Sequence, residues 1–174
     1  RESITAGEKD YSGLVSKLKS AGVGVMAFGG YHTEVALILR QAQQAGLKLT
    51  VMGGDTMTNS ELVTAAGPAA DNVFFTFAPD PRKNPSAAAV VKKFRDAKVE
   101  PEGYVMYAYA AMQLFADAAN AAKSTKYKDM EKALRSGSFD TVIGKLSFDA
   151  KGDNKLPGFM VYQWQGGKYD YVKK

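Results

Sequence analysis

The chain contains no cysteine and a single histidine, and these absences narrow its chemistry. Without cysteine there are no disulfides, thiolate nucleophiles or cysteine metal ligands. No strained nucleophile motif such as G-x-S-x-G accompanies His32, so we expect a helix-start residue there and not part of a catalytic triad. One histidine among scattered acids also supplies no cluster of metal ligands. We therefore expect a protein that is not an enzyme, with no catalytic residue and no metal site.

Long apolar runs and nucleotide-binding fingerprints are also missing. No run of roughly 18 apolar residues occurs, so the sequence predicts no transmembrane helix. The glycines at positions 22 and 24 lack the third glycine of a dinucleotide fingerprint, and they precede a predicted strand instead of following one. We therefore expect no cofactor. The first residues are polar and show no signal-peptide pattern, so we expect a mature or partial chain.

The composition is that of a globular protein. The chain has 174 residues, 45% of them hydrophobic, which is enough for a domain with its own core. The formal net charge is +5, but basic residues alternate with acidic ones, as in residues 92–96 (KKFRD). A nucleic-acid-binding surface would concentrate positive charge on one face. We therefore predict solvated helix faces and no nucleic-acid partner.

Helix and strand patterns alternate in the first half. Apolar residues recur at helical spacing over residues 11–18 and 35–42. Short apolar runs predict three buried strands, at residues 23–28, 49–52 and 72–77. Strands separated by helices of this length imply right-handed crossovers and a parallel sheet. The order begins with a helix, where a βα unit would supply a strand first, so we expect the chain to start in the middle of a fold.

The pattern changes after Pro79-Asp80-Pro81, which ends the third strand. Three helical patterns follow without a strand between them. The second of these, over residues 104–122, is apolar on most sides and is predicted to be buried. Strand-like sequence returns at residues 145–148, and two further strands flank Gly166-Gly167, which indicates a β-hairpin.

Two strand ends carry candidate ligand-binding residues. Tyr31 follows Gly29-Gly30, and Asp55 follows Gly53-Gly54. Ligands of open parallel sheets bind outside the carboxyl ends of the strands, and glycines let a backbone turn sharply and approach a ligand closely. Two interpretations stay open for each residue. Asp55 either caps the next segment or faces a cleft, and Tyr31 either packs half-buried or lines a ligand.

Several motifs, taken in order, carry a resemblance that covers nearly the whole chain. They are residues 7–12 (GEKDYS), 29–34 (GGYHTE), 38–42 (ILRQA), 109–113 (YAAMQ), 148–153 (FDAKGD) and 162–164 (YQW). Their order and spacing resemble the C-terminal half of the branched-chain amino-acid-binding family of periplasmic receptors, the leucine/isoleucine/valine-binding type. This resemblance implies the α/β fold of type I periplasmic binding proteins, a parallel sheet with flanking helices and a C-terminal β-hairpin.

The resemblance also implies a division of the chain. The family has two lobes joined by three crossings, with the ligand between them. Residues 1–78 would belong to the second lobe, and residues 79–149 would be the helical last part of the first lobe. Residues 150–174 would be a hairpin that returns to the second lobe, so this chain would hold a partial two-lobe fold.

Three site residues follow from the resemblance. Asp55 matches the acid that pairs with the α-ammonium group of the ligand. Tyr31 matches an aromatic residue of the second lobe, and Tyr104 matches an aromatic position where a helix of the first lobe faces the cleft. The residues that bind the ligand carboxylate would lie in the half that this chain lacks.

The resemblance implies a solute-binding component of an amino-acid ABC transporter in the periplasm. Its ligand would be a neutral aliphatic amino acid or a relative such as proline or γ-aminobutyrate, and its partner a permease in the membrane. The alternative is a sensing domain of the same fold that is not coupled to transport. Because the missing half would leave apolar surfaces and sheet edges exposed, we also expect self-association, with elements exchanged between chains.

Overall fold

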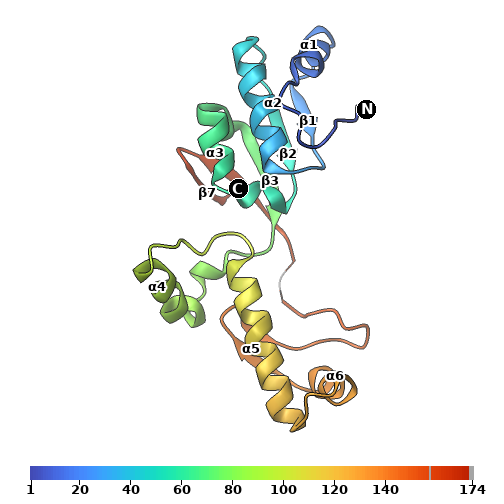
Figure 1. The fold of residues 1–174 in the computed structure, drawn as a ribbon, viewed down its shortest axis with the longest axis vertical. Helices are drawn as coiled ribbons and strands as arrows, with labels where there is room; N and C mark the ends of the chain where they lie inside the picture. Colours follow the sequence, from blue (N-terminus) through green and yellow to red (C-terminus); the bar gives the residue numbers. More distant parts are fainter. Residues whose placement is uncertain (157, 173–174) are drawn as a thin grey trace. The chain divides into compact units, whose positions relative to one another are not determined.

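The structure is a computed structural model, and it describes residues 1–156 and 158–172. The chain divides into two compact units (Figure 1). Unit 1 comprises Arg1–Ala78 and Phe159–Lys174, and unit 2 comprises Pro79–Gly158. Residues 150–158, which we grouped with the returning hairpin, thus lie in unit 2. The assignment of these segments to two lobes of a receptor stays a prediction.

Unit 1 is an α/β structure. Its helices are α1 (Ser12–Ser20), α2 (His32–Gln44), α3 (Glu61–Ala66) and the 3₁₀ segments η1 (Asp55–Thr58) and η2 (Gly67–Asn72). Its strands are β1 (Val25–Ala27), β2 (Thr50–Gly53), β3 (Val73–Phe77), β6 (Met160–Gln165) and β7 (Lys168–Tyr171). In the described residues these strands form one five-stranded sheet in the order β1-β2-β3-β6-β7.

The sheet confirms the predicted topology. Strands β1, β2 and β3 are parallel, as the alternating helices and strands predicted. Strand β6 runs antiparallel to β3, with Phe77 opposite Met160 at one end of the ladder. Strands β6 and β7 form the predicted hairpin, whose turn places Gly166 and Gly167 at φ of +55° and +81°. Positive φ values of this kind favour glycine, which explains the pair at this turn.

The core of unit 1 contains buried residues of helix α2 and of the central strands. The predicted apolar face of α2 is buried, with Val35 and Ile38 at 0% exposure. Helix α2 lies between α1 and α3 and contacts both (Figure 1). Phe75 of β3 stacks on Tyr162 of β6, with ring centroids 5.3 Å apart. The antiparallel hairpin is therefore bound to the parallel strands by aromatic packing as well as by backbone hydrogen bonds.

One strand prediction is wrong. Residues 23–28 were expected to form a buried strand, but β1 spans only Val25–Ala27 and lies at the edge of the sheet. Val25 is 69% exposed. The apolar composition of this segment is that of a central strand, and β2 covers only one of its two edges. Val25 is exposed because no second strand pairs with β1 within the described residues, and not because the segment is polar.

Unit 2 is mostly helical. Its helices are α4 (Ala88–Asp96), α5 (Val105–Ala122), α6 (Tyr127–Ser136) and the 3₁₀ turns η3 (Pro81–Lys83) and η4 (Pro85–Ala87). In its described residues, β4 (Phe139–Thr141) and β5 (Gly144–Leu146) form a two-stranded antiparallel sheet. A small core gathers Ala87, Val91, Met106, Ala110 and Val142.

The prediction that residues 104–122 are buried is also wrong. In the part of the chain that the structure describes, only Met106, Ala110 and Ala118 of α5 are buried. Met112 and Phe115 are 68% and 57% exposed. Helix α5 is apolar on most sides, as predicted, but its neighbours in unit 2, which include α4, α6, β4 and η3, cover it incompletely. No helix within the described residues is both long and apolar enough to span a membrane.

Candidate ligand-binding site

Tyr31 and Asp55 lie at the same edge of the unit 1 sheet. Strands β1 and β2 are parallel neighbours, with Ala27 opposite Met52. Tyr31 follows β1 and is the last residue before α2, and Asp55 follows β2 as the first residue of η1. Because the two strands run in the same direction, the segments that carry these residues leave the sheet at the same edge.

A side-chain hydrogen bond joins the two segments. The hydroxyl of Thr56 donates to the carbonyl of Gly30 over 2.7 Å, which ties the residue after Asp55 to the residue before Tyr31. The Tyr31 side chain is 63% exposed, so the interpretation that Tyr31 packs half-buried is wrong. Asp55 is partly exposed. An exposed ring and a carboxylate therefore share one fixed strand edge.

Two hydrogen bonds hold the segment that carries Asp55 in place. Met57 is fully buried, and the indole N–H of Trp164 on β6 donates to the Met57 carbonyl over 2.8 Å. The hydroxyl of Thr58 donates to the carbonyl of Asp55 over 2.8 Å. The N-cap position of η1 is held by Gly54, with Asp55 one residue inside. Hydrogen bonds to the carbonyls of Asp55 and Met57 therefore hold the backbone that carries the Asp55 side chain.

The glycines at the two strand ends act differently from the prediction. None of Gly29, Gly30, Gly53 and Gly54 has a positive φ, so the turns do not require glycine for its backbone freedom. A Cβ at Gly30 would lie 2.7 Å from the Phe28 ring, and one at Gly53 would lie 2.7 Å from Cγ of Met57. These two glycines make room for buried side chains. Gly29 and Gly54 have open space beside them, which leaves their backbone accessible to a ligand.

Glu34 is a buried carboxylate that sequence reasoning did not single out. It is 7% exposed and accepts hydrogen bonds from the Thr33 hydroxyl at 2.6 Å and the Gly7 N–H at 3.1 Å. The hydrogen bond from Thr33 lowers the pKa of Glu34 against the opposing effect of burial. Its position in the first turn of α2 was the available signal, since acids are favoured there. Glu34 joins the N-terminal segment to α2 and thus supports the segment behind Tyr31.

His32 takes the structural role predicted for it. It is the first residue of α2, and its Nε2 lies 3.1 Å from a carboxylate oxygen of Glu61 on α3. This pair connects the starts of two helices beside the strand edge. Within the described residues there is no group of three or more histidine or acidic side chains that could hold a metal ion.

Tyr104, the third predicted site residue, belongs to unit 2. It occupies the N-cap position of α5 and is 54% exposed. Its ring meets the ring of Tyr107 edge-on, with centroids 6.1 Å apart, and the Tyr107 hydroxyl donates to the Pro79 carbonyl over 2.7 Å. The Tyr104 ring is thus presented at the start of a helix. That it faces the same ligand as Tyr31 and Asp55 stays a prediction.

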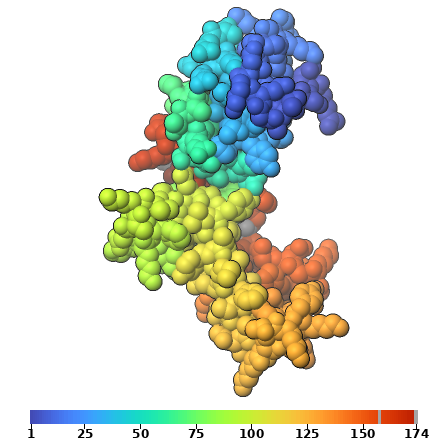
Figure 2. Space-filling model, viewed as in Figure 1, coloured from blue at the N-terminus to red at the C-terminus, as the bar shows by residue number. Residues whose placement is uncertain are grey.

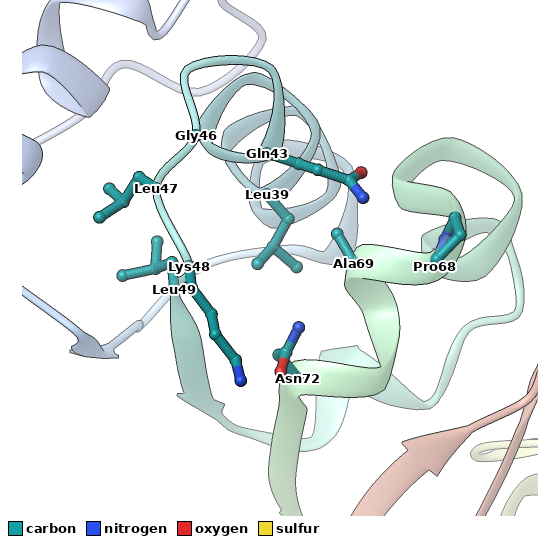
Figure 3. Close-up of a pocket in the computed structure, with 9 residues that line it drawn as sticks. All are labelled: Leu39, Gln43, Gly46, Leu47, Lys48, Leu49, Pro68, Ala69 and Asn72. Carbon is teal, nitrogen blue, oxygen red and sulfur yellow. The ribbon is translucent and has the colours of Figure 1, made fainter.

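A pocket of about 280 Å³ lies at the other end of the same strands (Figure 3). Its lining residues are Leu39, Gln43, Gly46, Leu47, Lys48, Leu49, Pro68, Ala69 and Asn72. Lys48 and Leu49 precede β2, and Asn72 precedes β3. The pocket is therefore at the amino ends of the strands, whereas ligands of open α/β sheets bind at the carboxyl ends. We assign the candidate site to the edge with Tyr31 and Asp55.

Comparison with known proteins places the chain in a family. Residues 1–168 match the periplasmic binding protein family. A Leu/Ile/Val-binding protein homolog 1 from Brucella suis is 49% identical over 99% of this chain and 48% of its own length. A leucine-, isoleucine-, valine-, threonine- and alanine-binding protein from Pseudomonas aeruginosa is 40% identical over 94% of this chain and 44% of its own length.

Solved structures agree with this assignment. A leucine-binding protein from Thermotoga maritima superposes with a TM-score of 0.83 at 26% identity, over 98% of this chain and 49% of the other. A branched-chain amino acid transporter substrate-binding protein from Streptococcus pneumoniae, in complex with isoleucine, gives a TM-score of 0.79 at 26% identity, over 98% of this chain and 51% of the other. The chain spans about half the length of the relatives it matches. It belongs to the periplasmic binding protein family, with the type I fold, and corresponds to the C-terminal half of the leucine/isoleucine/valine-binding type.

Proposed function

We propose that the chain is part of an extracytoplasmic solute-binding protein of an amino-acid ABC transporter. The observation that carries this proposal is the 40–49% identity, over nearly the whole chain, to proteins named for the binding of leucine, isoleucine and valine. The isoleucine complex of a similar structure supports a neutral aliphatic amino acid as the ligand class. The role is binding and not catalysis, and the location we propose is the periplasm.

Asp55 binds the α-ammonium group of the ligand in this proposal. A hydrogen bond between an ammonium and a carboxylate is charge-assisted and stronger than a neutral one. The contacts of Met57 and Thr58 hold the Asp55 backbone in place, so little conformational freedom is lost when the ligand arrives. Rigid placement of this kind is what recognition of a small ligand requires.

The tyrosines supply apolar surface for the aliphatic side chain. Tyr31 is 63% exposed and Tyr104 is 54% exposed, so both rings have area to lose on binding. Burial of apolar surface contributes about 25 cal/mol per Å². The binding group for the ligand carboxylate comes from the half of the receptor outside this chain. We therefore expect the chain by itself to bind amino acids weakly or not at all.

The binding partner in the membrane is an ABC permease in this proposal. Closure of two lobes around the ligand is a hinge motion, which couples ligand binding to the surface that a permease contacts. The sensing alternative predicts a receptor with no permease partner. Transport of radiolabelled leucine by cells with and without the gene separates the two, because a sensor is not required for uptake.

Calorimetry on a full-length receptor that carries this chain tests the proposal. Leucine, isoleucine and valine are expected to bind, and Asp55→Ala is expected to weaken binding by several kcal/mol, on the order of 2–5. Asp140→Ala is the matched control, because the Asp140 side chain is 84% exposed on β4. Unchanged amino-acid affinity in Asp55→Ala would remove Asp55 from the site. Absence of amino-acid binding in the unaltered receptor would overturn the proposed ligand class.

A further inference from the structure

The pocket at the amino ends of the unit 1 strands is separate from the candidate amino-acid site (Figure 3). Its volume of about 280 Å³ is close to the lower end of the range for ligand pockets, roughly 300–1,000 Å³. Strand β2 connects the two places, because Lys48 and Leu49 precede it and Asp55 follows it. The residues that line this pocket have no role in the proposed function.

The loop after α2 forms one wall of the pocket, and its path is fixed. The Leu47 N–H donates to the Ala42 carbonyl at 2.8 Å. The Gly46 N–H donates to the Gln43 carbonyl at 3.0 Å, and Gly46 has a φ of +69°. Two such hydrogen bonds around a left-handed glycine make a Schellman motif, which ends a helix with a defined chain path. Lys48, which follows at once, therefore starts from a fixed position.

Segment η2 forms the other wall and contacts α2 and α3, which lie side by side at the surface of unit 1 (Figure 2). The Gln163 amide donates to the Asp71 carbonyl at 3.0 Å, and the Gly166 N–H donates to the Asp71 carboxylate at 2.9 Å. Leu39 and Leu49 form the base, each with 2% exposure. Walls and base all belong to unit 1, so the pocket exists before a ligand arrives, which limits the entropy lost on binding.

Three polar side chains line the pocket, those of Gln43, Lys48 and Asn72. Within the described part of the chain, none of these side chains makes a hydrogen bond or an ion pair with another protein group. Lys48 offers three N–H donors, and each amide offers two. The lining residues include no acid. The pocket therefore presents one positive charge and an excess of donors beside an apolar base.

The negative end of the α2 dipole is offset at this place. The last carbonyls of a helix carry partial negative charge, which disfavours a nearby anion. Here the Gln41 and Gln43 carbonyls accept from the N–H groups of Ala45 and Gly46. The ammonium group of Lys19 donates to the Ala45 carbonyl at 2.6 Å. The end of α2 therefore leaves the positive charge of the pocket available to an anion.

We propose that this pocket binds a small carboxylate with an apolar tail and no ammonium group. The carboxylate accepts hydrogen bonds from Lys48 and from the amides of Gln43 and Asn72, and the bond from Lys48 is charge-assisted. The tail lies on the apolar base. An amino acid is a poor ligand here, because its ammonium group would lie near Lys48 with no lining acid to pair with it. This preference is opposite to that proposed for Asp55 and does not rest on it.

The test is a titration of the ¹⁵N-labelled 174-residue chain, followed by two-dimensional NMR. The probe is 4-methylpentanoate, which is leucine without its ammonium group. We expect saturable shifts of the backbone amides of residues 46–49 and 69–72, which line or adjoin the pocket. Leucine, 4-methylpentanamide and inorganic phosphate should bind about tenfold more weakly, because each lacks one feature of the probe or adds a positive charge.

Two variants separate binding in the pocket from attraction to surface charge. Lys48→Met keeps the length of the side chain and removes its charge, so it should weaken binding of 4-methylpentanoate about tenfold. Lys168→Met is its matched control, since Lys168 is exposed on β7 and does not line the pocket. Ala69→Met leaves Lys48 in place and fills the pocket from its η2 wall, so it should abolish saturable binding. Far-ultraviolet circular dichroism checks that each variant is folded.

Four results would overturn the proposal. They are no saturable shift at residues 46–49 and 69–72, shifts at Tyr31 and Asp55 in place of these, equal affinity of Lys48→Met and the unaltered chain, or equal affinity for leucine, the amide or phosphate. The first two outcomes deny the site, and the last two deny its preference for a carboxylate with an apolar tail. No arm requires the proposed amino-acid site to be complete, so the outcome is independent of the proposed function.

Discussion

The indole N–H of Trp164 and the carbonyl of Met57 form a buried hydrogen bond of 2.8 Å between residues 107 positions apart in the sequence. Trp164 lies on β6, and Met57 lies two residues beyond the candidate ligand residue Asp55. The last part of the chain therefore fixes a segment at the candidate site. Trp164→Phe keeps an aromatic ring and removes the donor, which leaves a buried carbonyl without its partner.

Trp164→Phe is expected to lower the free energy of unfolding by about 1–3 kcal/mol, the cost of an unsatisfied buried polar group. Urea denaturation followed by far-ultraviolet circular dichroism measures this, since Trp164 is the only tryptophan and fluorescence is lost with it. In a full-length receptor the same change should also weaken amino-acid binding, because η1 is held less firmly. Unaltered stability would show that the hydrogen bond contributes nothing.

Thr56→Val tests the connection between the two strand ends. The valine keeps the shape of the side chain and loses the hydroxyl that donates to the Gly30 carbonyl. Amino-acid affinity of a full-length receptor should fall while the fold is retained, and calorimetry measures the change. Thr64→Val is the control, because its hydroxyl donates to the Ser60 carbonyl at 3.5 Å on the exposed side of α3. Equal effects of the two variants would contradict a specific role for Thr56.

The lowered pKa of Glu34 predicts that the fold loses stability at acidic pH. Its pKa in the folded chain is lowered, chiefly by the hydrogen bond from Thr33. A carboxyl group with a folded pKa below its unfolded value stabilises the fold above the unfolded pKa, about 4.3 for glutamate. That contribution is lost as the pH falls from there through the folded pKa. Urea titrations between pH 3 and pH 7 should show a shallower dependence in Glu34→Gln.

Thr33→Val provides a second check on the same group. It removes the main donor to Glu34, so the folded pKa of Glu34 rises toward the unfolded value and the acid-induced loss of stability should be smaller than in the unaltered chain. Thr64→Val serves again as the control and should leave the size of the acid-induced loss of stability unchanged. A pH dependence that is identical in the unaltered chain, Glu34→Gln and Thr33→Val would assign the acid sensitivity to other groups.

The apolar surface of α5 predicts self-association of the isolated chain. Met112 and Phe115 are 68% and 57% exposed on one helix, and contiguous exposed apolar surface favours association. Static light scattering at rising concentration should show oligomers, and Phe115→Lys should shift the distribution toward monomer. Phe159→Lys is the matched control in unit 1, where Phe159 is 71% exposed. A monomer at high concentration would contradict the prediction.

Much of unit 1 was predictable because its local patterns agree with its tertiary contacts. The spacing of Val35 and Ile38 predicted the buried face of α2, and Gly166-Gly167 predicted the turn of the hairpin. The positions of Tyr31 and Asp55 at one sheet edge also followed from sequence, since parallel strands align their carboxyl ends. In each of these cases the prediction depends on the pattern within short stretches of sequence.

The errors arose where burial depends on distant chain. The composition of Val25-Met26-Ala27 predicted a buried strand, and that of residues 104–122 predicted a buried helix, yet both are exposed in this chain. Both segments are apolar enough for a buried position, but burial depends on neighbouring elements that the composition of a segment does not specify. The contact of Glu34 with Gly7 and that of Trp164 with Met57 were not predictable either, because the partners are separated by 27 and 107 positions.

Phe77 of β3 pairs with Met160 of β6, close to the residues at which the chain leaves unit 1 and returns to it. These residues face each other at the ends of two antiparallel neighbours, in the positions that a short hairpin loop would connect. All of unit 2 is thus inserted, in topological terms, at the tip of a hairpin of unit 1. A chain in which residues 79–158 are replaced by a short turn would keep every strand pairing of the five-stranded sheet formed by the described residues. We expect such a chain to fold as a continuous form of unit 1, because all the strands of the sheet would be retained in one stretch of sequence.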